Sequence, residues 1–193
     1  HDTTTHDFVI VGAGSAGCAL AHRLSEDGDR EVLLLEAGEP DDREEIHAPP
    51  RFPELYSSAV DWDYHTVPQP ELNDRRLYHP RGKTLGGSSS LNGMIYIRGH
   101  PSDYDTWADS GNEGWGYDDL LPYFKRAEHF EPGDGEYHGE GGPLNVAEQV
   151  EPHPVSEALV DAMAEVGIDH NPDFNADGQT GSGFYHLTQK DGE

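Results

Sequence analysis

Near its start the chain reads Asp7-Phe8-Val9-Ile10-Val11-Gly12-Ala13-Gly14-Ser15-Ala16-Gly17. The first five residues form a short apolar run that ends at a glycine, which is typical of a buried parallel strand. A helical pattern follows over residues 16–25 and is closed by Gly28, and a second apolar strand is expected over residues 31–36. This order of elements predicts an α/β fold that opens with a βαβ unit.

Gly12, Gly14 and Gly17 form a Gly-x-Gly-x-x-Gly motif within that unit. We expect the first glycine to permit the sharp exit from the strand, the second to let the backbone approach a pyrophosphate, and the third to let helix and strand pack closely. The amides at the start of the helix then face the anion. Glu36 ends the second strand, where a carboxylate accepts hydrogen bonds from an adenosine ribose and repels a 2′-phosphate. The pattern predicts a dinucleotide other than NADP.

A second glycine- and hydroxyl-rich segment covers residues 86–97, after the lead-in 80–85, in which Arg81 and Lys83 carry positive charge. Gly86 and Gly87 leave the backbone free to bend close to a flat ligand. Short donors and acceptors of hydrogen bonds follow at Ser88, Ser89, Ser90 and Asn92. Together the two motifs indicate a flavin dinucleotide whose adenine and ring ends are held separately. A serine-rich loop that precedes a strand and binds nothing is the alternative.

The charge balance is strongly acidic: 38 acidic against 12 basic residues in a chain of 193, a formal net charge of −26. Such a charge destabilises the compact state unless salt screens it, so we expect a surface of the halophilic type; an acidic surface that serves solubility is the alternative. Nucleic acid is excluded as a partner because phosphate binding needs a basic patch. No apolar run approaches the roughly 20 residues of a transmembrane helix. With no signal peptide visible, we expect a cytoplasmic protein, and peripheral membrane association stays open.

One cysteine, Cys18, excludes an internal disulfide and a cysteine metal cluster, and the twelve histidines show no paired metal spacing. We therefore predict no metal site and interpret the histidines as scattered surface residues. Later in the chain, helices are expected over residues 102–107, 117–130 and 154–166, with a strand within 183–189.

Residues 12–17 with 36–38, and residues 81–93, together resemble the glucose–methanol–choline (GMC) oxidoreductase family. Three further segments look most like its choline dehydrogenase and alcohol dehydrogenase members: residues 97–100, 103–107 and 137–143. The similarity extends from Asp7 to the last residue.

The resemblance implies two domains. The first is a Rossmann-like FAD-binding domain with a parallel sheet at residues 1–147, with excursions at 39–77 and 98–147. The second, at residues 148–193, is the beginning of an α+β substrate domain. The turn-like ending of the chain is typical of a C-terminal truncation.

FAD is the cofactor that the resemblance implies. The pyrophosphate would be held by Gly12, Gly14, Ser15, Ala16 and Gly17. The adenosine ribose would contact Glu36, and Ala37 belongs to the same cofactor site. The flavin end would be lined by Thr84, Ser88, Asn92, Gly93, Met94 and Ile95. Some members bind FAD covalently through a histidine just before the equivalent of Asn92; here Leu91 stands in that place, which predicts noncovalent FAD.

The implied reaction is the oxidation of a CH–OH group, a primary alcohol to an aldehyde, with electrons passing from FAD to another acceptor. In this family the catalytic histidine and its partner lie near the C-terminal end of a longer chain, so no catalytic residue is assigned here. Hydride transfer requires a positioned base, and we expect the 193 residues alone to be inactive, with at most weak FAD binding. The alternatives are an NAD-dependent Rossmann dehydrogenase, which has no use for residues 81–95, and a noncatalytic nucleotide-binding remnant.

Overall fold

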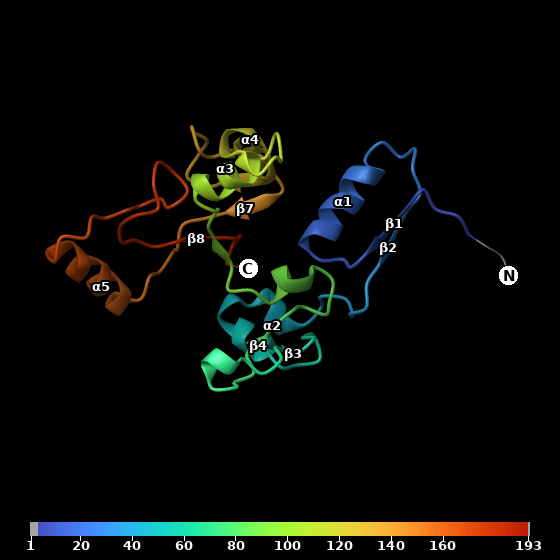
Figure 1. Ribbon diagram of the computed structural model, residues 1–193, viewed down its shortest axis with the longest axis horizontal. Coiled ribbons are helices and arrows are strands. Elements are labelled where there is room, and N and C mark those ends of the chain that lie inside the picture. Colours follow the sequence, from blue (N-terminus) through green and yellow to red (C-terminus); the bar gives the residue numbers. More distant parts are fainter. Residues whose placement is uncertain (1–3, 193) are drawn as a thin grey trace. The chain divides into compact units, whose positions relative to one another are not determined.

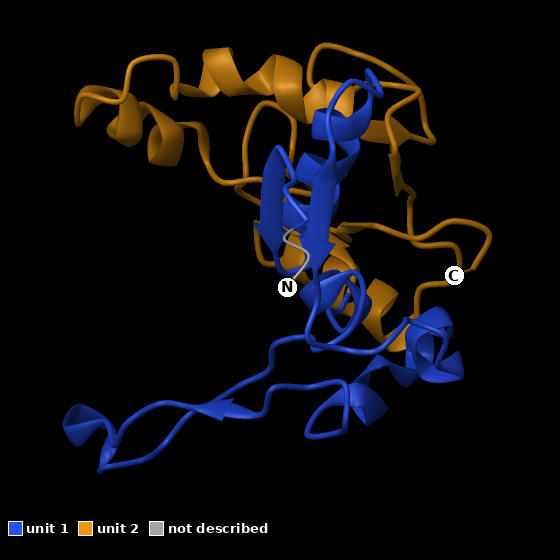
Figure 2. Ribbon diagram, turned by 90° about the vertical axis from the view of Figure 1, so that its right-hand side faces the viewer, with its two compact units in different colours: residues 1–93, 193 blue, residues 94–192 orange. Residues whose placement is uncertain are grey.

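The computed structural model describes residues 4–192. Within them the chain forms two compact units, residues 4–93 and residues 94–192, which Figure 2 shows in different colours. The expected division into residues 1–147 and 148–193 concerns cofactor- and substrate-binding roles, and it stays a prediction.

The first unit opens with the predicted βαβ arrangement (Figure 1). Strand β1 (Phe8–Val11) leads into helix α1 (Ser15–Ser25), and the chain returns through strand β2 (Val32–Leu35). The two strands are parallel, with Phe8 opposite Val32 and Val11 opposite Leu35. The α/β class and the parallel pairing expected from the apolar runs are confirmed.

The two strands are less buried than their apolar sequences predicted. Val9 is 56% exposed and Val11 84% exposed, and Cys18 on α1 is also exposed. The reason is architectural: within residues 4–192 the sheet formed by β1 has only two strands, so no third strand covers its edges. Apolar composition indicates a strand that is suited to burial, but a two-stranded sheet offers little surface to bury it against.

The rest of the first unit consists of short elements. These are helix α2 (Glu44–His47), strands β3 (Tyr64–His65) and β4 (Tyr78–His79), and the 3₁₀ turns η1 (Pro49–Leu55), η2 (Pro70–Leu72) and η3 (Gly87–Ser90). Strands β3 and β4 form an antiparallel pair. Leu55, Val60 and Leu91 make the buried apolar cluster of this unit, with Ile46 packed against it.

The second unit combines three helices with two small sheets. The helices are α3 (Pro101–Asp109), α4 (Tyr117–Ala127) and α5 (Pro154–Glu165). Strands β5 (Ile95–Tyr96) and β8 (His186–Leu187) pair antiparallel, and β6 (Glu128–Phe130) and β7 (Leu144–Val146) pair parallel. The helix predicted over residues 117–130 was therefore wrong at its C-terminal end, because the helix stops at Ala127 and residues 128–130 form β6.

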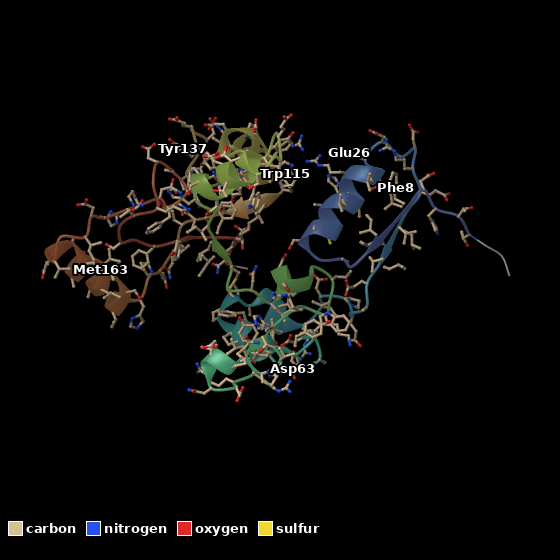
Figure 3. The ribbon with its side chains drawn as sticks, in the orientation of Figure 1. Phe8, Glu26, Asp63, Trp115, Tyr137 and Met163 are labelled. Atoms are coloured by element: carbon tan, nitrogen blue, oxygen red, sulfur yellow. The ribbon has the colours of Figure 1, made fainter. Side chains whose placement is uncertain are left out.

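None of the three helices of the second unit contains a fully buried residue. Aromatic rings of Tyr104 and Phe124, 5.6 Å apart, join α3 to α4. Helix α5, which carries Met163 (Figure 3), has no buried residue. Among the described residues, no helix combines the length and the apolar character that crossing a bilayer requires.

Candidate functional site

The glycine-rich loop between β1 and α1 has the geometry that its sequence predicted. Gly12 has φ +96°, a left-handed conformation, and its amide donates to the Leu35 carbonyl at 2.7 Å. A Cβ atom on Gly17 would lie 1.9 Å from the Gly12 carbonyl oxygen, so only glycine allows α1 to approach the loop this closely. The first and third glycines are thus explained by backbone conformation and packing.

The start of α1 presents backbone amides without a side-chain cap. Gly14 is the N-cap residue and supplies no capping side chain, and Ser15 and Ala16 of the first turn are exposed. The Ser15 hydroxyl hydrogen-bonds to that of Ser89. Uncapped first-turn amides, reinforced by the helix dipole, suit an anionic group such as a pyrophosphate.

Glu36 follows β2 and ties the loop to the end of that strand. Its Oε2 accepts from the Ala13 amide at 2.7 Å, and its Oε1 accepts from the Gly38 amide at 2.8 Å. The hydrogen bond from Ala13 is the main cause that lowers the pKa of Glu36, so the side chain stays ionised. Each carboxylate oxygen has a second lone pair, which leaves capacity for the ribose hydroxyls expected there. Ala37, beside it, is exposed.

The second motif lies directly against the first. The Gly86 amide donates to the Ala13 carbonyl at 2.8 Å, and Gly14 and Gly86 form a parallel bridge. Gly87 has φ +57°, and a Cβ on it would lie 2.8 Å from the Gly14 Cα. Two loops that are far apart in the sequence therefore form one continuous backbone surface, which is the juxtaposition that the flavin interpretation requires.

A cleft of about 600 Å³ opens over this surface. Residues of both motifs line it, together with aromatic and basic side chains: Val11, Gly12, Gly14, Leu35, Glu36, Ala37, Trp62, Tyr64, Arg81, Gly82, Gly87 and Ser88. A second cavity of about 260 Å³ shares Arg81, Gly82 and Ser88 with the cleft and continues to Asn92 and Gly93. The shared residues make the two cavities neighbours within the first unit.

The aromatic wall of the cleft was missed by the sequence analysis as part of the site. The rings of Trp62 and Tyr64 stack with centroids 5.7 Å apart and planes 9° from parallel. The Lys83 ammonium lies 4.8 Å from the centroid of the Trp62 ring. The available signal was the spacing of two aromatic residues, Trp62 and Tyr64, on either side of Asp63, which has a left-handed φ of +51°.

The three remaining residues predicted at the flavin end, Thr84, Met94 and Ile95, belong to two different units of the chain. Thr84 is fully buried, and its hydroxyl donates to the Glu39 carbonyl at 2.8 Å. Met94 and Ile95 belong to the second unit, where the Met94 carbonyl accepts from the Thr188 amide at 2.8 Å and Ile95 is exposed in β5. Roles of these three residues at the flavin stay predictions.

The second unit contains a buried charge network that the sequence analysis also missed. Arg98 and Glu128, with side chains 3% and 0% exposed, are paired at 2.7 Å. Arg98 also donates to the Tyr137 carbonyl at 2.7 Å, and the Gly139 amide donates to Glu128 at 2.9 Å. Burial alone would raise the pKa of Glu128, but hydrogen bonds from His138 and Gly139 and the charge of Arg98 lower it.

Two histidines belong to the same region, so the interpretation of all histidines as surface residues was wrong. His138 is buried, donates or accepts at 2.8 Å with Asp173 Oδ2, and stacks on Phe130 with ring centroids 3.8 Å apart. His186 is also buried, 3.8 Å from Asp173. The spacing of the histidines along the sequence could not predict these contacts, because their partners lie far away in the sequence. Within residues 4–192, no group of three or more His, Cys, Asp or Glu side chains is arranged to hold a metal ion.

Comparisons with known proteins agree with this geometry. Over 190 residues, 97% of its length, the chain is 48% identical to an alcohol dehydrogenase [acceptor] of Pseudomonas putida and covers 34% of that protein. It is 47% identical over 191 residues, again 97% of its length, to an oxygen-dependent choline dehydrogenase of Vibrio vulnificus, of which it covers 34%. The crystal structure of pyridoxine 4-oxidase from Mesorbium loti superimposes with a TM-score of 0.92 at 42% identity, over 97% of this chain and 37% of that one.

The chain spans about a third of the length of the curated relatives it matches. The family model described as GMC oxidoreductase matches residues 6–193, nearly the whole sequence. The resemblance of the two glycine motifs is thereby confirmed, and this chain belongs to the GMC oxidoreductase family.

Proposed function

We propose that this chain forms the FAD-binding part of an oxidoreductase that acts on CH–OH groups. The observation that carries the proposal is the hydrogen bond of the Gly86 amide to the Ala13 carbonyl, which joins the two motifs along one cleft. An NAD-dependent dehydrogenase would need only the first motif. Here Arg81, Gly82, Gly87 and Ser88 of the second motif line the same cleft, which favours the longer flavin dinucleotide.

The residues present fit FAD at its pyrophosphate. Gly14 leaves open backbone at the cleft, and the first-turn amides of Ser15 and Ala16 supply donors. Glu36 would accept from the ribose, next to Ala37. At the other end Ser88, Asn92 and Gly93 line the second cavity and would hold the flavin end. The sequence adds Thr84, Met94 and Ile95 to that end.

Noncovalent attachment is supported by Leu91. Its side chain is 2% exposed and packs with Leu55 and Val60, and it has no nucleophilic atom that could bond to the flavin. When bound, FAD supplies the two-electron acceptor for the hydride of an alcohol carbon. The residues of this chain bind and orient the cofactor, and none of them is assigned as the base.

The names of the relatives support the substrate class. One is an alcohol dehydrogenase and another a choline dehydrogenase, so we propose a primary alcohol that is oxidised to an aldehyde. The electron acceptor and the assembly of the protein are left unassigned. The cytoplasmic location stays a prediction from the sequence.

Titration of the chain with FAD, NAD⁺ and NADP⁺ tests the proposal. We expect quenching of flavin fluorescence on binding of FAD, no displacement by either nicotinamide cofactor, and release of all flavin when the protein is precipitated with acid. Flavin that stays in the pellet would contradict noncovalent attachment. Preference for NAD⁺ over FAD would overturn the flavin assignment, and alcohol-dependent dye reduction by this chain alone would show that a catalytic base lies among these residues.

A further inference from the structure

Asp61 is the most heavily hydrogen-bonded buried carboxylate of the first unit, and no role in the cofactor site follows from the motifs. The residue is 6% exposed. Its Oδ1 accepts from the amides of Asp63 and Arg81, each at 3.0 Å. Its Oδ2 accepts from the Ser57 amide at 2.9 Å and from the Tyr78 hydroxyl. Four donors thus converge on one carboxylate.

These donors come from two segments that pair antiparallel, through the bridge of Asp61 to Gly82 and through strands β3 and β4. Residues 57–63 supply two of them, and residues 78–81 supply the other two. Backbone hydrogen bonds flank the carboxylate on both sides: the Trp62 amide donates to the Arg81 carbonyl at 2.9 Å, and the Lys83 amide donates to the Val60 carbonyl at 2.7 Å. Asp61 therefore lies within the paired region, and its carboxylate adds four hydrogen bonds to the backbone pairing.

These two segments, extended by one residue each to Tyr64 and Gly82, also contribute to the lining of the cleft. Trp62 and Tyr64 come from the first segment, and Arg81 and Gly82 from the second. Asp63, labelled in Figure 3, lies between the two aromatic residues in the sequence and is exposed. The carboxylate of Asp61 does not line the cleft, so it can influence a ligand only through these neighbours.

The four donors around Asp61 require an ionised carboxylate, because both of its oxygens must accept hydrogen bonds. An ionised carboxylate offers lone pairs on both oxygens, whereas an asparagine amide presents N–H groups on one side. In Asp61→Asn, the NH₂ group of the asparagine must face one of the two pairs of donors. One pair is the Ser57 backbone amide and the Tyr78 hydroxyl, and the other is the backbone amides of Asp63 and Arg81. A buried donor that meets another donor loses its hydrogen bond and keeps its desolvation cost.

We propose that Asp61 is a positioning residue of the cofactor cleft, which fixes the wall of Trp62 and Arg81 at the separation that FAD requires. The inference rests on the proposed function, because it assigns that cleft to FAD. Asp61 acts on the ligand through the two residues that it holds, and its substitution weakens FAD binding without removing any group that lines the cleft.

The test compares Asp61→Asn with Asp63→Asn in the 193-residue chain. Both changes remove one negative charge within the same segment, but among residues 4–192 the Asp63 carboxylate accepts a hydrogen bond only from the Ser57 hydroxyl, at 3.0 Å. We expect Asp61→Asn to weaken FAD binding about tenfold or more, the equivalent of one hydrogen bond to a charged group. Asp63→Asn should stay within about twofold of the parent chain.

A second readout needs no ligand. The chain has three tryptophans, and ¹⁹F NMR of the fluorotryptophan-labelled protein resolves each of them. Trp107 and Trp115 lie in the second unit and report whether it stays folded. We expect Asp61→Asn to shift or broaden the Trp62 resonance alone, and Asp63→Asn to leave all three unchanged.

The outcomes separate the two proposals. Unchanged FAD affinity and an unchanged Trp62 resonance in Asp61→Asn would overturn the positioning role, while FAD binding by the parent chain would leave the proposed function standing. If the parent chain binds no FAD, the proposed function fails, and the Trp62 resonance alone decides whether Asp61 holds the wall. If Asp61→Asn fails to fold, Tyr78→Phe replaces it; this change removes one donor to Asp61 and one of the two acceptors of the Ser57 amide. A selective shift of Trp62 supports the role, and no shift overturns it.

Discussion

The amide nitrogen of Gly86 lies 2.8 Å from the carbonyl oxygen of Ala13 and donates a hydrogen bond to it. This bond connects the loop after β1 to the beginning of η3 at the point where both backbones turn. Gly87 then passes so close to Gly14 that no side chain fits between them on its side. The two glycine-rich loops of the first unit, which both line the cleft, are therefore held in place by contact with each other.

We expect Gly87→Ala to lower the stability of the fold and Gly14→Ala to weaken FAD binding. A Cβ on Gly87 would lie 2.8 Å from the Gly14 Cα, at a φ of +57°. The left-handed conformation alone costs about 1–2 kcal/mol, and the contact adds to it. A Cβ on Gly14 would lie 3.9 Å from the nearest atom, at an ordinary φ of −79°. Gly14→Ala should therefore fold normally but fill part of the cleft.

Urea unfolding and FAD titration of both variants check this pair. We expect a lower free energy of unfolding for Gly87→Ala, and for Gly14→Ala an unfolding free energy within about 0.5 kcal/mol of the parent with clearly weaker FAD binding. Normal FAD affinity in Gly14→Ala would show that the pyrophosphate does not approach this residue.

Glu36→Gln is expected to weaken FAD binding about tenfold, the equivalent of one hydrogen bond to a charged group. Glutamine has one oxygen for the two amides of Ala13 and Gly38, so one amide loses its acceptor. The matched control is Glu39→Gln, an exposed neighbour with the same change of charge. Equal FAD affinities of the two variants, measured by flavin fluorescence, would show that Glu36 does not contribute to FAD binding.

The pH dependence of that site follows from the lowered pKa of Glu36. A carboxyl whose pKa is depressed on folding stabilises the folded state above its ordinary pKa of 4.5 and loses this contribution as the pH falls through the lower value. FAD affinity of the parent chain should therefore be flat at neutral pH and decline only under strongly acidic conditions.

Local patterns predicted the parts of the fold that depend on near neighbours. The β1–α1–β2 unit, the left-handed Gly12 and the close packing of Gly17 all follow from one motif. The end of α4 did not, because residues 128–130 leave the helix to pair with β7, and Glu128 is buried against Arg98, 30 positions away. A helical pattern cannot encode a partner at that distance.

The same reason explains the missed part of the site. Trp62 and Arg81, which line the cleft, come from distant segments that pair through the backbone and through the Asp61 carboxylate, whose partners lie between 2 and 20 positions away. Sequence alone marks aspartate as a turn or surface residue. Long-range hydrogen bonds, not composition, made Asp61 and His138 into buried structural groups.

His138 gives the second unit a stability that depends on pH. Burial would lower the pKa of this histidine, but the carboxylates of Asp173 and Glu128, which accept from its ring and attract its charge, raise the pKa above its ordinary value of 6.5. Its contribution is fully present below about 6.5 and is lost as the pH rises through the raised value. Asp173 and Glu128 have lowered pKa values, so their contribution is lost only as the pH falls toward acid.

His138→Gln should therefore cost about 1–3 kcal/mol of unfolding free energy at mildly acidic pH and much less at alkaline pH. The control is His22→Gln, a change at an exposed position of α1. Urea unfolding across the pH range checks the difference between variant and parent. A deficit of constant size at every pH would contradict a charged His138.

Salt should stabilise the chain because its 38 acidic residues face only 12 basic ones. Raising the ionic strength from about 0.1 M to about 1 M shortens the Debye length from roughly 10 Å to roughly 3 Å, which screens the mutual repulsion of surface carboxylates. We expect the urea midpoint to rise steeply over this range of KCl and then level off. Sucrose at equal osmolarity is the control, since it strengthens burial without screening charge. If the midpoint instead falls as salt enters the molar range, the acidic surface is no adaptation to salt and serves solubility alone.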